Sequence, residues 1–178
     1  MASTYKYQLL ILLFSLSINA FAQYASHSKP NIFIYIADDQ NSWDYEIFGN
    51  SQVKTQNFDR LVKEGLRFSN AYTTQAVCAP SRSQLFTGLY PMKNGCFANH
   101  LPVRNVKDIN DFMSELGYEV VLAGKGHIKP NSVFNWTRYF PTNSDRGIPI
   151  NKVEDYIANA QKPLCIIFSS DLPHGPFP

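Results

Sequence analysis

The sequence predicts an α/β domain built on a mostly parallel β-sheet with helices on both faces. Short apolar runs rich in β-branched residues alternate along the chain with segments whose apolar residues recur at helical spacing. Parallel strands need helical crossovers between them, and the helices bury both faces of the sheet. The chain has 178 residues, 44% of them apolar and 17% charged, which is enough for a buried core.

The first 22 residues are predicted to be a signal peptide outside this domain. Lys6 gives a positive start, residues 9–16 form a short apolar core, and residues 20–22 are a small-residue cleavage site. We therefore expect export to a periplasm, a lysosome or the extracellular space, depending on the source. The apolar core is shorter than the ~20 residues that span a bilayer, so no stable membrane anchor is expected. An uncleaved anchor is the alternative.

The first half of the chain predicts one strand, one helix and a second extended segment. Residues 31–37 are a near-continuous apolar run, as expected of a buried parallel strand. A helix is predicted from Thr55, with Gly65 as its stop. Residues 66–72 are then predicted to be a strand or an extended segment.

The middle of the chain predicts two more helices. One starts just after Cys78, where Pro80 suits the first turn, and it ends at Gly88. The other is capped by Asp108 and closes at Gly117.

The remaining residues predict two strands separated by a long excursion. The strands are expected at residues 118–123 and 164–168. Residues 128–161 are rich in Pro, Asn and aromatic residues, and they predict a surface excursion that faces the substrate. A helix is expected within it, at residues 153–160.

Charge and cysteine content limit the possible partners. The formal charge is +2, and no run of Lys and Arg forms a polybasic patch, so a nucleic-acid partner is not expected. Three cysteines in an exported chain leave one unpaired. Cys165 lies inside a predicted apolar strand and is expected to be a buried thiol.

Polar side chains follow three of the predicted strands. Asp38 and Asp39 come after the first strand, Lys125 and His127 after another, and His174 after the last. In open parallel sheets, ligands bind beyond the carboxyl ends of the strands. We therefore expect these three clusters to form one site.

Cys78, Asp38 and Asp39 could each have a purely structural role. A lone cysteine is usually a small buried side chain, but Cys78 stands at a helix start where unpaired backbone N–H groups favour an anion. Asp38 and Asp39 could cap a turn, but adjacent carboxylates are also the hard oxygen ligands that Ca²⁺ takes. Arg82 lies one helical turn after Cys78, within reach of it.

Taken together, these motifs resemble the formylglycine-dependent sulfatases of the alkaline-phosphatase-like superfamily. The resemblance covers nearly all of the chain after the leader and rests on Asp38-Asp39, Cys78-Ala79-Pro80-Ser81-Arg82 and Gly124-Lys125-Gly126-His127. It implies that a maturation enzyme reads Cys-x-Pro-x-Arg and converts Cys78 to formylglycine (3-oxoalanine). One hydroxyl of the hydrated aldehyde would attack sulfur, and collapse of the hemiacetal would release sulfate.

The resemblance also implies a role for each site residue. Arg82 fixes the hydrate, Lys125 contacts the sulfate, and His127 is the base for sulfate release. His174 protonates the leaving group, and His100 is a second candidate for substrate binding. One divalent cation, Ca²⁺, would be held by Asp38, Asp39 and Cys78. Gly126 departs from the family, in which a bulky aromatic residue is more common at that position.

The implied substrate is a sulfated carbohydrate. Asp38-Asp39-Gln40, Asn94-Gly95 and the Pro- and Asn-rich stretch after His127 look most like N-sulfoglucosamine sulfohydrolases, whereas a glycan O-sulfatase has the same core. Residues 23–178 are expected to be the N-terminal part of the catalytic domain, truncated at the C-terminus. The family's other metal ligands and one further lysine are then expected beyond Pro178.

Two alternatives belong to other classes. A phosphate or phosphonate ester hydrolase on the same fold would also place metal-binding acids at strand ends, but Cys78 with Pro80 and Arg82 speaks against it. An inactive fragment that binds anions weakly is the second alternative.

Overall fold

The computed structural model describes residues 29–176. The chain divides into two compact units, Met1–Pro30 and Asn31–Pro178, and all helices and strands described below belong to the second. The predicted signal peptide lies outside the described residues. None of the helices in residues 29–176 has the length and hydrophobicity that crossing a bilayer requires.

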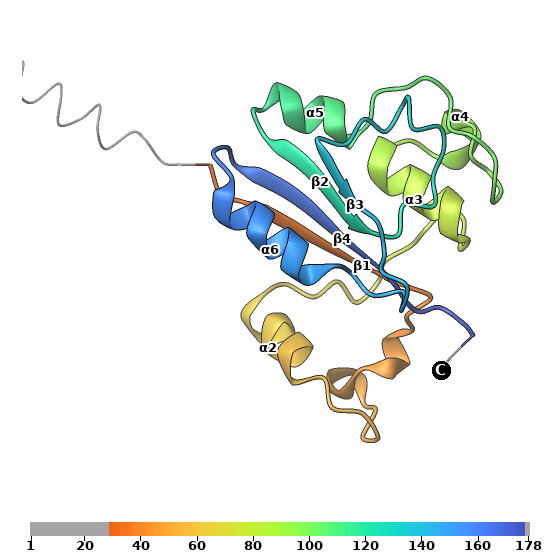
Figure 1. The fold of residues 1–178 in the computed structure, drawn as a ribbon. Coiled ribbons are helices and arrows are strands. Elements are labelled where there is room, and N and C mark those ends of the chain that lie inside the picture. Colours follow the sequence, from red (N-terminus) through yellow and green to blue (C-terminus); the bar gives the residue numbers. More distant parts are fainter. Residues whose placement is uncertain (1–28, 177–178) are drawn as a thin grey trace, which may run out of the picture. The chain divides into compact units, whose positions relative to one another are not determined.

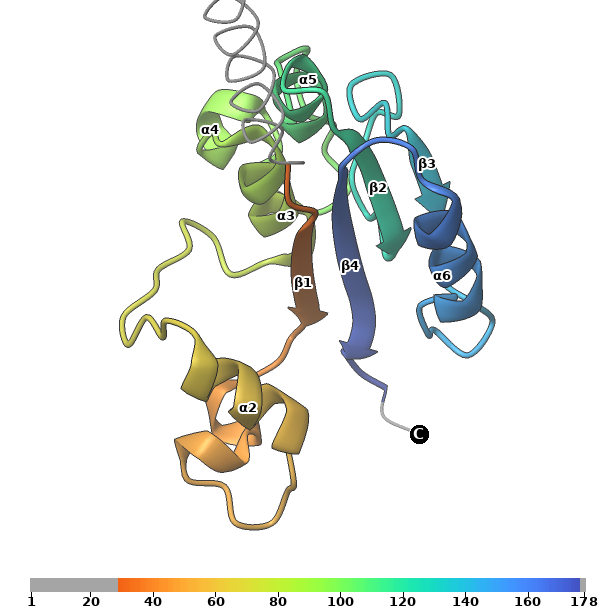
Figure 2. The same ribbon diagram turned by 90° about the vertical axis from the view of Figure 1, so that its left-hand side faces the viewer.

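The described residues form a four-stranded sheet, and all of its strands are parallel, as expected of the predicted mostly parallel sheet (Figures 1 and 2). Their order across the sheet is β1-β4-β2-β3. The strands are β1 (Ile32–Asp38), β2 (Glu119–Gly124), β3 (Arg138–Phe140) and β4 (Leu164–Pro173). In Figure 2 all four arrows point the same way, so their carboxyl ends share one edge of the sheet.

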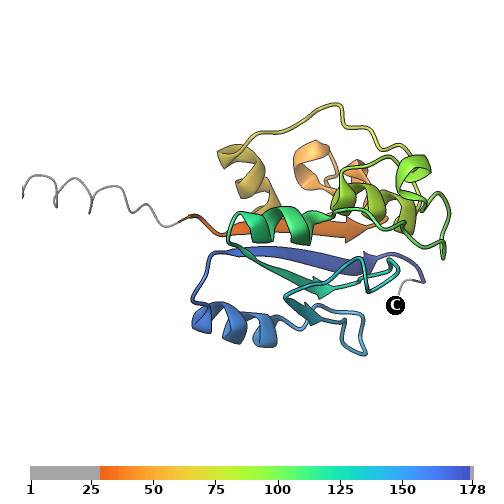
Figure 3. The ribbon, with the colours of Figure 1, turned by 90° about the horizontal axis from the view of Figure 1, so that it is seen from above.

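Helices cover both faces of this sheet (Figure 3). The helices α3 (Cys78–Thr87) and α5 (Ile109–Glu115) lie on one face, and α6 (Ile150–Asn159) lies on the other. Side chains alternate along each strand, so Leu122 of β2 packs toward α3 while Val121 packs toward α6. Both residues are fully buried. Cys96 and Cys165 are free buried thiols, which confirms the prediction for Cys165.

Residues at the helix ends determine where the predicted helices begin and end. Thr55 and Gly65 flank α2 (Gln56–Glu64), and Gly88 ends α3 in the left-handed conformation, with φ of 67°. Asp108 accepts hydrogen bonds from two backbone N–H groups at the start of α5, in a full capping box. The structure adds a short helix that the sequence did not predict, α4 (Pro91–Asn94).

Three segments differ from their predictions. Residues 66–72 are neither helix nor strand, and their large apolar side chains are exposed, so the strand alternative is wrong and only an irregular connection remains. β3 lies within the predicted excursion and was missed. β4 extends five residues further than predicted, to Pro173, because it pairs with β1 along its length.

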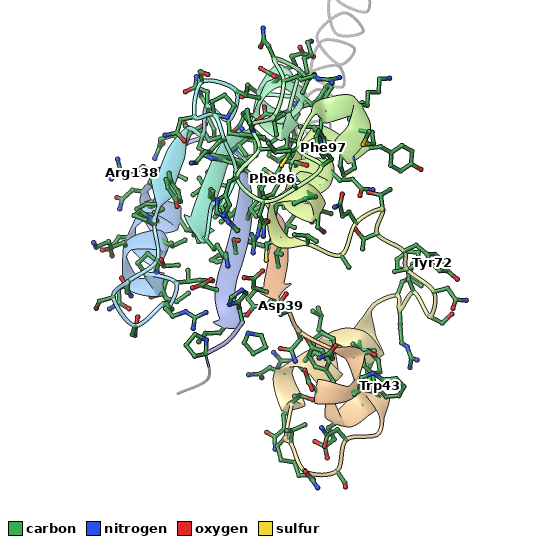
Figure 4. The ribbon with its side chains drawn as sticks, turned by 90° about the vertical axis from the view of Figure 1, so that its right-hand side faces the viewer. Asp39, Trp43, Tyr72, Phe86, Phe97 and Arg138 are labelled. Carbon is green, nitrogen blue, oxygen red and sulfur yellow. The ribbon has the colours of Figure 1, made fainter. Side chains whose placement is uncertain are left out.

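A small aromatic cluster lies between β1 and α3 in the sequence. Tyr45 stacks on Phe58 with ring centroids 3.9 Å apart, and Phe48 packs edge-on against both rings. This cluster joins α2 to the short 3-10 helix η2 (Glu46–Phe48), which follows another, η1 (Ser42–Asp44). Figure 4 labels Trp43 and Tyr72, two side chains of this region that are exposed.

Candidate active site

Strands far apart in the sequence bring their polar side chains to one edge of the sheet. Asp38 is the last residue of β1, Lys125 follows β2, and His174 follows β4. The ligand atoms of Asp38, Cys78 and His174 lie within 4.8 Å of one another. Figure 4 shows the adjacent Asp39 at the end of β1, beside the end of β4. The three clusters that follow the strands therefore meet.

Asp38 is the buried centre of this cluster. Lys125 Nζ forms an ion pair with its Oδ2, and Arg82 Nη2 lies 3.3 Å from its Oδ1. Burial would raise the pKa of Asp38, but the hydrogen bonds and charges of Lys125 and Arg82 outweigh burial and hold that pKa below its ordinary value. Asp38 is therefore a carboxylate between two cations.

Arg82 connects β1, β4 and the segment after β2 through hydrogen bonds. Its side chain is 3% exposed, and it donates to the Lys125 carbonyl oxygen at 3.2 Å and to the Ser169 hydroxyl oxygen, besides Asp38. The Ser169 hydroxyl in turn donates to the Lys125 carbonyl at 2.6 Å. The sequence predicted that Arg82 lies within reach of Cys78. The hydrogen bonds in the structure indicate a second role for Arg82, which is to fix Asp38 and the Lys125 backbone.

A close approach of β2 to β4 sets the position of Lys125. The Lys125 N–H donates to the Ser169 carbonyl at 2.7 Å. A Cβ atom on Gly124 would lie 2.0 Å from that same carbonyl oxygen, and Gly124 has φ of 105°. Only glycine allows this approach and this backbone conformation. The glycine therefore directs Lys125 toward Asp38.

Cys78 opens α3 and lines a cavity of about 300 Å³ with Asp38, Asp39 and Arg82. Burial raises the pKa of the Cys78 thiol, and the Asp38 carboxylate raises it further. The thiol is therefore protonated at neutral pH and is a weak nucleophile as it stands.

The start of α3 corrects one expectation about anion binding. Two of the N–H groups expected to be unpaired near Cys78 are not available. The Ala79 N–H donates to Asn99 Oδ1 at 3.1 Å, and Pro80, the third residue of the helix, has no N–H. Asn99 caps the helix from 20 residues downstream, so no local sequence pattern revealed it. The positive groups near Cys78 are therefore the Lys125 and Arg82 side chains.

The acids beside Cys78 fit one side of a hard-cation site. Asp38 and Asp39 provide carboxylate oxygens, and Ca²⁺ needs about six to eight oxygen ligands. The Asp39 side chain is 62% exposed, and its Oδ2 lies 3.7 Å from His174 Nε2. His174 thus joins Asp38 and Cys78 in the structure, whereas the sequence had assigned it to the substrate and its leaving group and not to the metal ligands.

His127 and His100 border a second cavity, of about 430 Å³. Their rings are 6.1 Å apart, and both residues have positive φ, at 51° and 69°. Burial lowers the pKa of His127, and the Lys125 and Arg82 charges lower it further. The imidazole is therefore neutral at pH 7, as a general base must be.

Tyr139 of β3 occupies the space beside Gly126. A Cβ atom on Gly126 would lie 3.1 Å from the Tyr139 hydroxyl oxygen, and that oxygen accepts a hydrogen bond from the Gly126 N–H. The aromatic ring that the sequence lacked between Lys125 and His127 is thus supplied from β3. Both Tyr139 and Gly126 line the 430 Å³ cavity.

The sequence did not predict that two charged residues, Asp171 and Arg146, belong to the site. Asp171 Oδ1 lies 2.7 Å from Lys125 Nζ, and Asp171 Oδ2 accepts from Arg146 Nε at 2.7 Å. Burial would raise the pKa of Asp171, but the hydrogen bonds and charges of Arg146 and Lys125 hold it below its ordinary value. Asp171 stands three residues before His174, a signal that could have been noticed. Arg146 is a lone arginine in a turn and gave no signal.

Comparisons with known proteins identify the family of this chain. A family model described as Sulfatase matches residues 30–178. An ulvan-active sulfatase of Formosa agariphila is 50% identical over an alignment of 159 residues that covers 86% of this chain and 32% of the relative. The chain thus spans about a third of that relative's length.

Solved structures share the fold. A protein in complex with its substrate D-glucosamine-2-N,6-O-disulfate has a TM-score of 0.73 at 22% identity, covering 83% of this chain and 35% of that one. The phosphonate monoester hydrolase of Agrobacterium radiobacter has a TM-score of 0.67 at 18% identity, covering 83% and 42%. Both likenesses confirm the predicted parallel sheet with flanking helices.

Proposed function

The chain belongs to the sulfatase family, and we propose that it acts as a sulfuric ester hydrolase that removes sulfate from a sulfated glycan. The observation that carries this proposal is the convergence of Asp38, Cys78 and His174 with the Lys125 and Arg82 cations. Two cations beside a buried carboxylate provide positive charge for a sulfate and an acidic group for a metal.

Cys78 is proposed to be the precursor of the nucleophile. A maturation enzyme would convert its thiol to the aldehyde of formylglycine, whose hydrate supplies two hydroxyl groups. The Cys78-Ala79-Pro80-Ser81-Arg82 motif supports this role, and the thiol's position in the cavity with Asp38 and Asp39 agrees with it.

Three further residues, Lys125, His127 and His174, are proposed to bind the sulfate and transfer protons. Lys125 binds the sulfate with its ammonium group, which Asp38 and Asp171 hold in place. His127, neutral at pH 7, takes the proton when sulfate is released. His174, beside Asp39, gives a proton to the leaving alcohol. A divalent cation, Ca²⁺, held by Asp38, Asp39 and the converted Cys78, would stabilise charge on a sulfate oxygen.

The substrate is proposed to be a sulfated polysaccharide in the compartment to which the signal peptide directs the chain. The Formosa agariphila relative is described as ulvan-active, which makes ulvan the first polymer to test. His100 would contact the sugar, because it shares the 430 Å³ cavity with His127. N-sulfated glucosamine is the competing substrate that the sequence motifs suggested.

The test uses the full chain, expressed with and without a formylglycine-generating enzyme. Mass spectrometry of the tryptic peptide containing Cys78 measures conversion. Sulfate release from ulvan fragments, 6-O-sulfated glucosamine and N-sulfated glucosamine is measured by ion chromatography. Cys78→Ala removes the nucleophile, and Cys165→Ala is the matched control, because it removes a buried thiol away from the site.

We expect sulfate release that requires conversion, disappears in Cys78→Ala and persists in Cys165→Ala. Equal activity in the converted and unconverted protein would disprove the formylglycine mechanism. Faster cleavage of phosphate or phosphonate monoesters than of any sulfate would replace this function with the phosphonate hydrolase alternative.

A further inference from the structure

Arg146 holds the chain segment that carries His174. Its guanidinium donates to Asp171 Oδ2 at 2.7 Å, to the Asp171 carbonyl at 2.9 Å, to the His174 carbonyl at 2.7 Å and to the Pro176 carbonyl at 3.2 Å. One side chain thus binds four oxygens spread over six residues. The planar guanidinium holds several N–H donors in a fixed arrangement, which suits these four acceptors. The single ammonium group of a lysine could not donate to all four oxygens.

The segment that Arg146 binds has little apolar support. Asp171–Pro176 continues β4 past its buried portion, and the Leu172 side chain is exposed. Besides the pairing of Pro173 with Asp38 of β1, its polar contacts among the described residues include Leu172 N–H to Ser170 Oγ at 3.0 Å, a contact between His174 and Gly175, and the charge pairs of Asp171 and His174. Arg146 therefore supplies four hydrogen bonds to a segment that is paired with β1 only as far as Pro173.

The turn that presents Arg146 is anchored and strained. Arg146 has φ of 67°, a left-handed conformation that is unfavourable for residues other than glycine. The Asn143 N–H donates to the Gly147 carbonyl at 2.9 Å, and the Arg146 N–H donates to the Asn143 carbonyl at 3.0 Å. Ile148, just after the turn, packs with the core on the α6 face. Such strain at a fixed position is typical of functional sites.

The contacts of Arg146 extend to the centre of the site. Arg146 binds one oxygen of Asp171, and Lys125 binds the other. Lys125 also pairs with Asp38. Alternating cations and carboxylates thus connect the turn before α6 with the carboxylate beside Cys78.

We propose that Arg146 is a positioning residue, which holds His174 and, through Asp171, Lys125 in their working places. This inference rests on the proposed function, because it assigns these two residues their work in sulfate ester hydrolysis. Arg146 itself does not touch the substrate. It acts on the geometry in which His174 meets the leaving group, where small displacements have large effects on rate.

The experiment compares Arg146→Gln, Arg146→Lys and Arg146→Gly in the full chain, with Arg138→Gln as the matched control. Arg138 is an exposed arginine of β3 that stacks over Phe140 and lies outside the site. Figure 4 shows it at the β3 edge of the sheet, opposite the β1 edge where Asp39 lies. The measurements are kcat and KM for a sulfated glycan, thermal unfolding, and hydrogen exchange of the amides of residues 171, 172, 174 and 175.

We expect Arg146→Gln to lower kcat about 100-fold with KM nearly unchanged, and to speed exchange at these four amides. Arg146→Lys should recover only part of the rate, because one ammonium cannot reach all four oxygens. Arg146→Gly should show the same fall in kcat as Arg146→Gln but no loss of thermal stability, because glycine readily adopts the left-handed conformation of this turn. Arg138→Gln should keep wild-type kcat and exchange.

Two outcomes would overturn the inference, and they differ from failure of the proposed function. Wild-type kcat in Arg146→Gln would exclude a positioning role. A loss of kcat that follows thermal stability, and that Arg138→Gln reproduces, would assign Arg146 to folding alone. A wild-type protein with no sulfatase activity would refute the proposed function. In that case unchanged amide exchange in Arg146→Gln would still overturn the contact of Arg146 with the His174 segment.

Discussion

Replacing Gly124 by alanine tests whether the close approach of β2 to β4 is essential. The added Cβ atom would lie 2.0 Å from the Ser169 carbonyl oxygen and 2.9 Å from its carbonyl carbon. Both are backbone atoms in the middle of the sheet, so no side-chain rotation can relieve the clash. The strands must move apart, and the hydrogen bond from the Lys125 N–H to the Ser169 carbonyl is lost or lengthened.

Two costs add up in this variant. Alanine at φ of 105° costs about 1–2 kcal/mol, and an extra methyl group in a packed interior costs about 1–3 kcal/mol. The expected loss is therefore about 2–5 kcal/mol, a large part of the ~5–15 kcal/mol that keeps a domain folded.

Gly88→Ala is the matched control for the backbone cost alone. Gly88 has φ of 67°, and no atom lies within 4 Å of the place where its Cβ would be. This control should lose about 1 kcal/mol. The assay is the urea midpoint of the full chain, measured by circular dichroism at unchanged m-value. Equal losses in Gly124→Ala and Gly88→Ala would refute the argument that backbone contact between β2 and β4 demands glycine.

Three further predictions concern neighbouring groups. Asn99→Ala removes the acceptor of the Ala79 N–H and should lower stability by about 1 kcal/mol, seen as a lower urea midpoint. Ser169→Ala removes one of the acceptors of the buried Arg82 guanidinium and should cost about 1–3 kcal/mol in the same assay. Because the pKa of His127 is lowered from its ordinary value of 6.5, the fall of kcat toward acid pH should have its midpoint below pH 6.5.

Each of these predictions has a contradicting result. An Asn99→Asp variant should retain the cap, so equal losses in Asn99→Asp and Asn99→Ala would argue against capping. An unchanged midpoint in Ser169→Ala would mean that the hydroxyl does not satisfy buried groups. An acid-side fall of kcat with its midpoint above pH 6.5, or one that persists in His127→Asn, would exclude His127 as the base.

The sequence predicted those elements whose signals are local. β1 and β4 are apolar runs, and Asp108 and Gly88 have the side-chain and backbone chemistry that begins and ends helices. The convergence of Asp38, Lys125 and His174 followed from a general property of parallel sheets, because their carboxyl ends share one edge.

The missed features depend on contacts between distant parts of the chain. β3 has three residues, too few for a periodic pattern, and it exists because it pairs with β2. Asn99 caps a helix that starts 21 residues before it, and Arg146 binds oxygens 25–30 residues after it. Residues 66–72 have strand-forming side chains, but no strand of the described chain pairs with them.

The last strand of the described chain lies in the interior of the sheet. β4 separates β1 from β2, which therefore cannot pair with each other while the chain is being made. Until residues 164–173 leave the ribosome or the export channel, β1 and β2 have no common neighbour, and the Asp38 carboxylate has not met Lys125.

This interval is when the proposed maturation enzyme can read its motif. In the folded chain Arg82 is 3% exposed and Pro80 is fully buried, so two of the three recognition residues are hidden once β4 has joined the sheet. Because Arg82 donates to Ser169 of β4, its buried hydrogen bonds cannot be complete before residues 164–173 have been made. Conversion of Cys78 would then be a co-translational or pre-folding event, timed by the position of a single strand.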